Sequence, residues 1–152
     1  SSESALLDVL QKLDKQEQYS PDITVFLQCT SPFTKVEDID ETINALIDNH
    51  ANCALAVTKF HHFLWEYDQN KDTIIGINHN EKNSRKRRQE LATQYLEAGP
   101  IYVMQTNEFL KHKKRFFGKI SYHLIPQDRV FEIDNPIDLS ISDFLASQEH
   151  EN

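Results

Sequence analysis

Glycine is scarce in this chain, with only 3 residues among 152. Nucleotide-binding α/β proteins normally carry a Gly-rich turn after their first strand, because the backbone there must approach phosphates closely. No such turn is present in the sequence. A complete phosphate cradle of that kind is therefore not expected within these residues.

Cysteines, basic residues and long apolar runs are also few. Cys29 and Cys53 each lie in an apolar run, which is typical of small packed side chains and indicates neither a disulfide framework nor a zinc site. With 24 acidic against 16 basic residues, the formal charge of −8 argues against non-specific nucleic-acid binding. No apolar run is long enough to span a membrane, and no signal-peptide pattern opens the chain. We expect a soluble cytoplasmic protein with no nucleic-acid or membrane partner.

Hydrophobic periodicity predicts alternating helices and strands at the start of the chain. Apolar residues spaced by three and four predict helices over residues 4–14 and 36–49. Nearly continuous apolar runs at 23–29 and 53–60 are typical of strands buried in a parallel sheet. This order of elements indicates a doubly wound α/β sheet within a single domain.

A polar stretch interrupts that pattern at residues 61–88, which are rich in Asn and Lys. We expect this stretch to leave the sheet as an inserted arm with a short hairpin near 73–77. The sequence after the arm predicts further elements. These are strands at 99–105, 120–126 and 130–133 and a short helix at 106–112, capped by Thr106 or Asn107.

The last predicted element is a helix that begins after Asn135. Asn135 is its expected N-cap and Pro136 its first helical residue. Its apolar residues are expected to point inward; they are Ile137, Ile141, Phe144 and Leu145.

Two segments far apart in the sequence share one design, in which a short apolar run leads into a polar turn and then a helix. They are FLQCTSPF at 26–33 and EIDNPIDL at 132–139. Polar residues at the carboxyl ends of strands are where open α/β sheets bind their ligands. The first segment offers amide and hydroxyl groups, and the second offers carboxylates. We therefore expect the two segments to form one site.

Glu132 and Asp134 are the candidate metal ligands. In a strand, residues two apart face the same side, and Mg²⁺ prefers a few carboxylates together with waters and phosphate oxygens. On sequence alone, the commoner role for such an aspartate is to stabilise the start of the following helix. Asp138, three residues after Asn135, fits that second role.

Gln28 and Arg88 are the candidate substrate contacts. The Gln28 amide can both donate to and accept from a polyhydroxylated substrate, and Thr30 could add a hydroxyl contact. A glutamine satisfied within its own turn is an equal alternative. Arg88 could pair bidentately with a planar carboxylate, although a surface arginine within the basic run 82–88 is the commoner case.

Four segments, in this order, resemble the acylneuraminate cytidylyltransferases (CMP-sialic acid synthetases), whose patterns read approximately LQPTSPLR, RRQ(D/E)LP, YxxNGAIYI and (E/D)IDxxxDL. The matching segments of this chain are FLQCTSPF, RRQEL at 87–91, YLEAGPIY at 95–102 and EIDNPIDL. The resemblance covers nearly the whole chain, and it is the order and spacing of the motifs that make it specific. The family's Gly-rich segment, which resembles IIPARGGSKGIPRKN, would precede Ser1. Residues 1–152 would then be the C-terminal portion of a cytidylyltransferase domain.

The resemblance implies a fold and a reaction. The fold is a three-layer α/β domain with a mostly parallel, doubly wound, Rossmann-like nucleotidyltransferase sheet, and residues 61–88 would form an inserted dimerisation arm. The reaction joins CMP from CTP to a nonulosonic (sialic-type) acid and releases pyrophosphate. Mg²⁺ is the implied cofactor, and a homodimer is the implied assembly.

The resemblance also implies residue roles. Asp134 and Glu132 fall on the family's metal-binding acidic positions, and Arg88 falls on the arginine that binds the substrate carboxylate. The expected catalytic residues are thus Asp134 and Arg88. The expected substrate-binding residues are Gln28, Thr30, Arg88, Gln89, Tyr102, Phe116 and Phe117. Ser1 and Ser2 match a serine pair that follows the cytosine-recognition loop. Without the resemblance, the three aromatic residues would be interpreted as core.

The sequence departs from the family pattern at several positions. Cys29 and Ala92 replace prolines, Thr34 stands near the usual arginine, and Trp65 lies near a position where bacterial members place a lysine. The departures at Cys29, Thr34 and Trp65 would suit a related substrate such as legionaminic, pseudaminic or an eight-carbon keto sugar acid. A second alternative is a non-catalytic dimerisation or sugar-binding remnant of such an enzyme.

Overall fold

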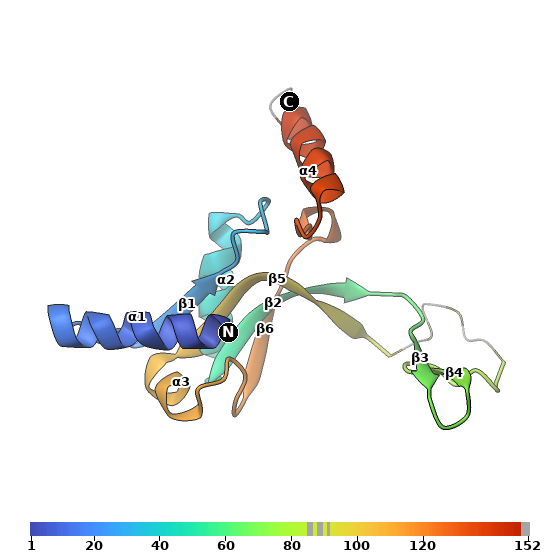
Figure 1. Cartoon of the computed structure of the whole chain (residues 1–152), viewed down its shortest axis with the longest axis horizontal. Helices are drawn as coiled ribbons and strands as arrows, with labels where there is room; N and C mark the ends of the chain where they lie inside the picture. The colour runs from blue at the N-terminus through green and yellow to red at the C-terminus, as the bar shows by residue number, and fades with distance from the viewer. Residues whose placement is uncertain (85–86, 88–89, 91, 150–152) are drawn as a thin grey trace. The chain divides into compact units, whose positions relative to one another are not determined.

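The computed structural model describes residues 1–84, 87, 90 and 92–149, and it divides into two compact units. One unit comprises residues 1–58 and 97 onward, and the other is Lys59–Leu96. Figure 1 shows the elements along the chain. In order, they are α1 (Ser2–Glu17), β1 (Ile23–Leu27), α2 (Val36–Asp48), β2 (Cys53–Phe60), β3 (Trp65–Asp68), β4 (Thr73–Gly76), β5 (Gln94–Gln105), α3 (Thr106–His112), β6 (Ile120–Leu124), the 3₁₀ turn η2 (Gln127–Arg129) and α4 (Pro136–Glu149).

The first unit is built on a four-stranded sheet with the order β1-β5-β2-β6. Strands β2 and β6 are parallel, with Cys53 opposite Ile120. Strand β1 pairs antiparallel with β5, from Ile23 opposite Gln105 to Leu27 opposite Ile101. The expectation that the first strand is buried in a parallel sheet is therefore wrong. An apolar run indicates that both faces of a strand are buried, but it does not indicate the direction of the neighbouring strand.

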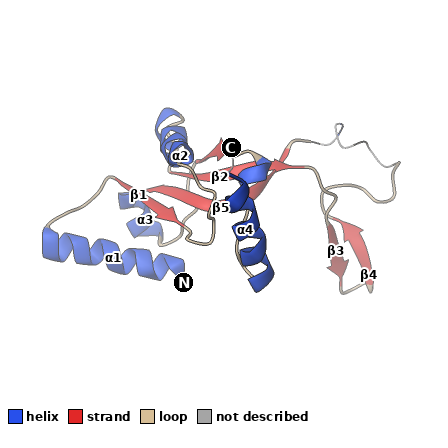
Figure 2. Cartoon of the chain, turned by 90° about the horizontal axis from the view of Figure 1, so that it is seen from above, coloured by secondary structure: helices blue, strands red, loops and turns tan. Residues whose placement is uncertain are grey.

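Helices cover both faces of this sheet, which is the predicted three-layer arrangement (Figure 2). On one face, Leu46 of α2 packs against alternating residues of the strands; these are Ala54, Ala56, Ile101 and Val103. On the other face, Leu10 of α1 and Phe109 of α3 pack against Cys53 and Met104. The alternation follows from the period of two in a strand, which sends successive side chains to opposite faces.

Helix α3 is joined to β1 by an unexpected pair of hydroxyls. The side chain of Thr106 does not cap the helix, contrary to the expectation, and its oxygen lies 2.8 Å from the Thr24 hydroxyl in a buried hydrogen bond. Gln105 occupies the N-cap position without a side-chain capping bond. The buried threonine pair thus connects the start of α3 directly to the sheet.

The C-terminal part differs from the sequence prediction in two ways. Residues 130–133 form no strand, because Pro126 and η2 turn the chain after β6. Helix α4 begins at Pro136 as predicted, but the expected inward orientation of its apolar side chains is wrong: Ile137 is 65% exposed and Phe144 is 64% exposed. Helical periodicity predicts an apolar face without showing what covers it.

The second unit contains the hairpin expected in the arm. Strands β3 and β4 pair antiparallel, with Trp65 opposite Gly76 and Asp68 opposite Thr73. The Asn78 side chain, just after β4, connects to the segment just before β3. It accepts from the Leu64 N–H at 2.9 Å and donates to the His62 carbonyl at 2.8 Å. Across the described residues of both units, no helix is sufficiently long and apolar to cross a membrane.

Candidate active site

The two polar segments predicted to form one site do lie together. The backbone N–H of Ile133 donates to the carbonyl of Thr30 at 2.9 Å. Beside this bond, the rings of Phe33 and Phe131 meet edge to face with centroids 6.1 Å apart. The end of β1 and the loop before α4 are therefore neighbours, although they come from opposite ends of the chain.

Strand β1 ends in a tight turn that carries Gln28. The Gln28 N–H donates to the Pro100 carbonyl at 3.1 Å, and its own carbonyl accepts from the Ser31 N–H at 3.3 Å. The Gln28 side chain is half-buried, and its amide makes no hydrogen bond to any described residue. The amide is thus held at the end of the strand with its hydrogen-bonding capacity free for a ligand, within the described part of the chain.

The turn after Gln28 contains one unsatisfied hydroxyl. The Oγ of Ser31 is buried and has no hydrogen-bond partner among the described residues. The Ser31 side chain does not cap the turn; instead, the Thr34 hydroxyl donates to the Ser31 carbonyl at 2.9 Å. Buried hydroxyls are usually paired, so this one marks an incompletely satisfied turn.

Glu132 lies directly against Gly99 of β5. A Cβ at Gly99 would stand 1.8 Å from the Glu132 Oε1, and Gly99 has a φ of +81°, so both contact and backbone require glycine there. Burial raises the pKa of Glu132, and the charges of Asp134 and Glu97 raise it further. The charge of Asp134 therefore acts on Glu132, and so does that of Glu97, which sequence analysis did not single out.

Asp138 serves the start of α4, as predicted. One of its carboxylate oxygens accepts from the backbone N–H of Asp134 at 3.0 Å and from that of Asn135 at 2.8 Å. These backbone bonds lower the pKa of Asp138. Asp138 is thereby committed to the loop, and Asp134 keeps its own carboxylate free of this task.

Tyr102 is buried, with 3% of its surface exposed. Its ring stacks on Phe26 at 5.9 Å between centroids and meets Phe116 edge to face at 5.9 Å. Its hydroxyl donates to Glu97. Burial raises the pKa of Tyr102, and the bond to Glu97 raises it further, which keeps the hydroxyl protonated. Tyr102 is thus a buried residue of the site whose hydroxyl is bonded to Glu97.

The two phenylalanines of the predicted aromatic pair have different environments. Phe117 is 9% exposed and packs in the core formed with α1 and α3. Phe116 is less buried and lines a cavity of about 530 Å³. The other residues around this cavity are Ser1, Glu3, Glu97, Lys113, Lys114 and Arg115. Phe116 is accordingly the member of the pair that a ligand could reach.

Arg115 is a second residue that sequence analysis missed. Its guanidinium carbon stands 4.5 Å from the centroid of the Tyr102 ring, and its Nε donates to Glu3 at 2.9 Å. The basic run KHKKR at 111–115, directly before the aromatic pair, is the sequence signal that could have pointed to it.

Four predicted site residues complete the set. Ser1 is the N-cap of α1, its hydroxyl accepting from the Ser4 N–H at 3.4 Å, and Ser2 is the first residue of that helix. Arg88 and Gln89 lie outside the described residues. The predicted pairing of Arg88 with a carboxylate and the predicted substrate contact of Gln89 stay predictions.

Comparisons with known proteins support the resemblance drawn from the motifs. No family model matches this sequence. The chain is 25% identical over 157 aligned residues to the pseudaminic acid cytidylyltransferase of Campylobacter jejuni subsp. jejuni serotype O:23/36, and 24% identical to that of serotype O:2. Each match covers all of this chain and 65% of the relative, so the chain spans less than two thirds of their length.

A solved structure shows the same fold. The crystal structure of 4-diphosphocytidyl-2C-methyl-D-erythritol synthase from Anaerococcus prevotii DSM 20548 matches with a TM-score of 0.66 and 14% sequence identity. The match covers 97% of this chain and 67% of that one. The predicted α/β fold class is thereby confirmed, and the resemblance to cytidylyltransferases agrees with the two sequence relatives.

Proposed function

We propose that this chain is part of a cytidylyltransferase that joins CMP from CTP to a nonulosonic acid and releases pyrophosphate. The similarity to two pseudaminic acid cytidylyltransferases over the whole chain supports the proposal. The single observation that carries it is the bond from the Ile133 N–H to the Thr30 carbonyl. This bond places a turn that offers amide and hydroxyl groups beside a loop that offers carboxylates, as such a reaction requires.

In the proposed reaction, the anomeric 2-hydroxyl of the sugar acid attacks the α-phosphorus of CTP. A carbon–oxygen–phosphorus link forms, the bond to the pyrophosphate leaving group breaks, and the hydroxyl proton passes to a base or to solvent. The reaction needs no covalent nucleophile, so the protein's task is positioning and charge neutralisation. Gln28 and Thr30 would hold sugar hydroxyls, Phe116 would give the sugar an apolar wall, and Arg88 would pair with its carboxylate.

Mg²⁺ is proposed as the cofactor, held by Glu132 and Asp134. Burial raises the pKa of Glu132 and the charge of Asp134 raises it further, and a divalent cation relieves that kind of repulsion. Within the described part of the chain, no group of three or more His, Cys, Asp or Glu side chains is arranged to hold a metal. Two carboxylates with waters and phosphate oxygens match the usual coordination of Mg²⁺. When bound, the ion would neutralise charge on the triphosphate.

Pseudaminic acid is the first substrate to test, because it appears in the names of both sequence relatives. Sialic acid, legionaminic acid and an eight-carbon keto sugar acid are the other members of the same chemical class. A non-catalytic sugar binder is the second candidate function. The absence of a Gly-rich turn among these 152 residues favours that candidate for the chain taken alone.

We also propose that the enzyme is a homodimer that associates through the second unit. Several large apolar side chains of the β3–β4 hairpin are exposed, which is typical of an interaction surface. They are Trp65, Tyr67, Ile74 and Ile77. Light scattering would test this: Ile74→Asp should halve the mass of the particle, and a monomeric wild-type protein at micromolar concentration would contradict the proposal.

The decisive experiment measures Mg²⁺-dependent pyrophosphate release from CTP, in the natural protein with any sequence encoded upstream of Ser1. Each nonulosonic acid is supplied in turn. Asp134→Asn should lower kcat on the order of 100-fold or more, because charge neutralisation of this kind usually contributes that much. Asp138→Asn is the matched control, since Asp138 binds only backbone and amide groups of its own loop. Binding of a sugar acid without any release would favour the non-catalytic alternative.

A further inference from the structure

We propose that Asp38 and Arg129 form a clamp that holds the acidic loop, residues 130–135, in its working position beside the end of β1. Both would be positioning residues of the proposed transferase, so the proposal rests on that function. Asp38 lies in the first turn of α2 and Arg129 ends η2, which leads directly into the loop. Neither residue belongs to the predicted site.

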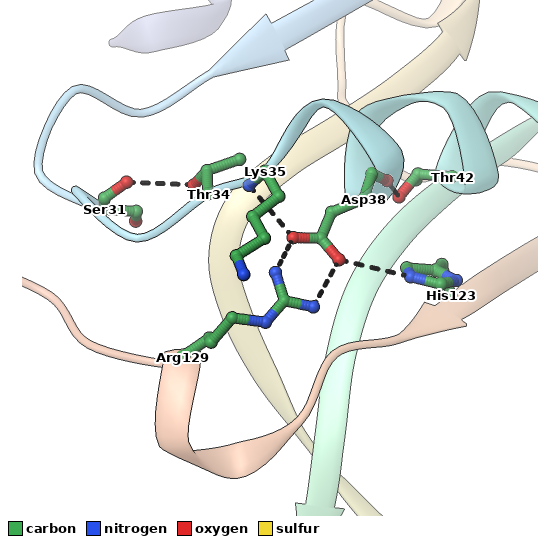
Figure 3. A network of polar contacts seen from close by, with 7 residues as sticks. All are labelled: Ser31, Thr34, Lys35, Asp38, Thr42, His123 and Arg129. Atoms are coloured by element: carbon green, nitrogen blue, oxygen red, sulfur yellow. Dashed lines mark hydrogen bonds and ion pairs between the residues drawn. The ribbon is translucent and has the colours of Figure 1, made fainter. Parts of the chain in front are cut away.

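The Asp38 carboxylate is the centre of a buried polar network (Figure 3). It is 2% exposed and accepts from both terminal nitrogens of Arg129, with Nη2 2.9 Å from Oδ1. It also accepts from the Lys35 N–H at 3.0 Å, and the His123 Nε2 lies 3.5 Å from Oδ1. A single side chain thus fixes the start of α2 and the end of η2 at the same time.

The charges of the pair are maintained in the folded protein. Burial raises the pKa of Asp38, but the hydrogen bonds from Arg129 and from the Lys35 N–H outweigh it, so the net pKa is lowered. The bond to Asp38 also raises the pKa of Arg129. A bidentate pair between an arginine and a carboxylate fixes orientation as well as distance.

Three contacts in succession attach the acidic loop to a single segment, residues 30–38. Arg129 binds Asp38, the Phe131 ring meets the Phe33 ring, and the Ile133 N–H binds the Thr30 carbonyl. The attachments come at every second residue. Glu132 lies between the second and third of the attached residues, and Asp134 follows the third. The charge of Asp134 acts on Glu132. The clamp is the strongest of the three contacts because it is ionic and bidentate.

A buried ion pair adds little stability compared with a well-packed apolar pair of similar volume, because both charges lose their hydration. What the pair adds is a fixed geometry. Without it, one ring contact and one backbone hydrogen bond would remain of the three contacts between the loop and residues 30–38. Glu132 and Asp134 would then occupy a wider range of positions, and metal affinity would fall while the turn at Gln28 keeps its place.

The test compares Arg129→Gln with Arg129→Lys in the natural full-length protein. Two quantities besides activity are measured: Mn²⁺ affinity in the presence of CTP, and the hydrogen exchange of the Ile133 amide. Arg129→Gln should weaken metal binding about 10-fold or more, as loss of groups that orient metal ligands does, and should speed exchange at Ile133. Arg129→Lys should recover part of both, because it restores the charge without the bidentate geometry.

Leu46→Ala is the matched control, because it destabilises the same face of α2 without touching the clamp. At an equal loss of Tm, it should leave metal affinity and Ile133 exchange unchanged. Equal effects in Leu46→Ala and Arg129→Gln would overturn the proposal, since the pair would then act only through stability.

The double variant Asp38→Leu with Arg129→Met keeps the experiment decisive if single variants fold poorly. An apolar pair of this kind commonly preserves or raises stability. We expect a folded protein with weakened metal binding and lowered kcat. A folded double variant with wild-type metal affinity would refute the clamp. If the wild-type protein releases no pyrophosphate with any acid, the proposed function fails, and exchange at Ile133 still decides whether the clamp holds the loop.

Discussion

The two faces of the sheet each carry an arginine–carboxylate pair, and the two pairs are built differently. On the α2 face, Asp38 is 2% exposed and accepts two hydrogen bonds from Arg129. On the α1 face, the Glu3 side chain is 24% exposed and accepts from the Arg115 Nε alone, at 2.9 Å. The Asp38–Arg129 pair holds the backbone of α2 and that of η2 together. The second holds a guanidinium at the wall of a cavity, over the ring of Tyr102.

This difference shows that equal residue types can serve different tasks. The buried Asp38 carboxylate is bound by both terminal nitrogens of Arg129, so this pair has little capacity left for a ligand. Arg115 is anchored through one nitrogen and packs on aromatic rings, which leaves the rest of its charge available to an anion in the cavity. Removing only the arginine of the first pair should therefore damage stability most, and removing that of the second should damage binding most.

The largest expected effect comes from breaking the α2-face pair. Arg129→Gln leaves the Asp38 carboxylate buried without its partner, which should lower the free energy of unfolding by about 3–5 kcal/mol. Urea unfolding followed by circular dichroism would measure this. A loss no larger than that of Arg115→Gln would remove the contrast between the two pairs.

The next effect concerns Arg115. Arg115→Gln should cost only about 1–2 kcal/mol of stability, because its partner is partly exposed and can be hydrated. It should raise the KM for the sugar acid or for CTP several-fold with a smaller change in kcat. Lys12→Gln, which removes an exposed pair on the same helix α1, is the control and should change neither quantity.

Acid titration should separate Asp38 from ordinary surface carboxylates. Its folded-state pKa is lowered, so its contribution to stability is complete above the ordinary aspartate pKa of about 3.9 and is lost as the pH falls below that value. In Asp38→Asn, the free energy of unfolding should consequently fall less steeply with decreasing pH in that acid range. Unfolding curves at a series of pH values would reveal the two slopes, and identical slopes would contradict the buried pair.

The smallest effect is expected from Tyr102→Phe. The variant keeps the ring under Arg115 and removes the hydroxyl, with its bond to Glu97 and its interaction with Arg115, which should cost about 0.5–1.5 kcal/mol. If the position of Arg115 depends on the ring alone, substrate KM should hardly change. A KM shift as large as that of Arg115→Gln would show that Glu97 also controls the cavity.

Much of the fold was predictable because it depends on local periodicity. Strand β2 and helix α3 have the predicted bounds, and α4 begins at the predicted proline. The direction of β1 relative to its neighbour was not predictable, since it depends on how the chain returns from the second unit. The exposure of the apolar side of α4 likewise depends on tertiary contacts that periodicity does not contain.

The candidate site was also predictable in part, because part of it follows from local sequence patterns. Polar residues at strand ends led to the turn at Gln28 and the loop at Glu132, which the structure brings together. Asp38 and Arg129 were missed because an acidic residue in the first turn of a helix already has a sufficient local role. The two residues are 91 positions apart in the sequence, so only the folded structure shows that they pair.

Gly99 has a consequence for the order of side chains along β5. In a regular strand, residues five apart face opposite sides, yet Glu97 and Tyr102 are bonded to each other. Ala98 and Ile101, three apart, likewise share one core. The strand must therefore accommodate one extra residue near Gly99, as a β-bulge does. Upstream of that glycine, the side chains of β5 therefore point to the opposite faces from those that a regular strand would give them. Inserting or deleting a single residue between 97 and 102 would turn Glu97 away from the site while the rest of the sheet kept its register.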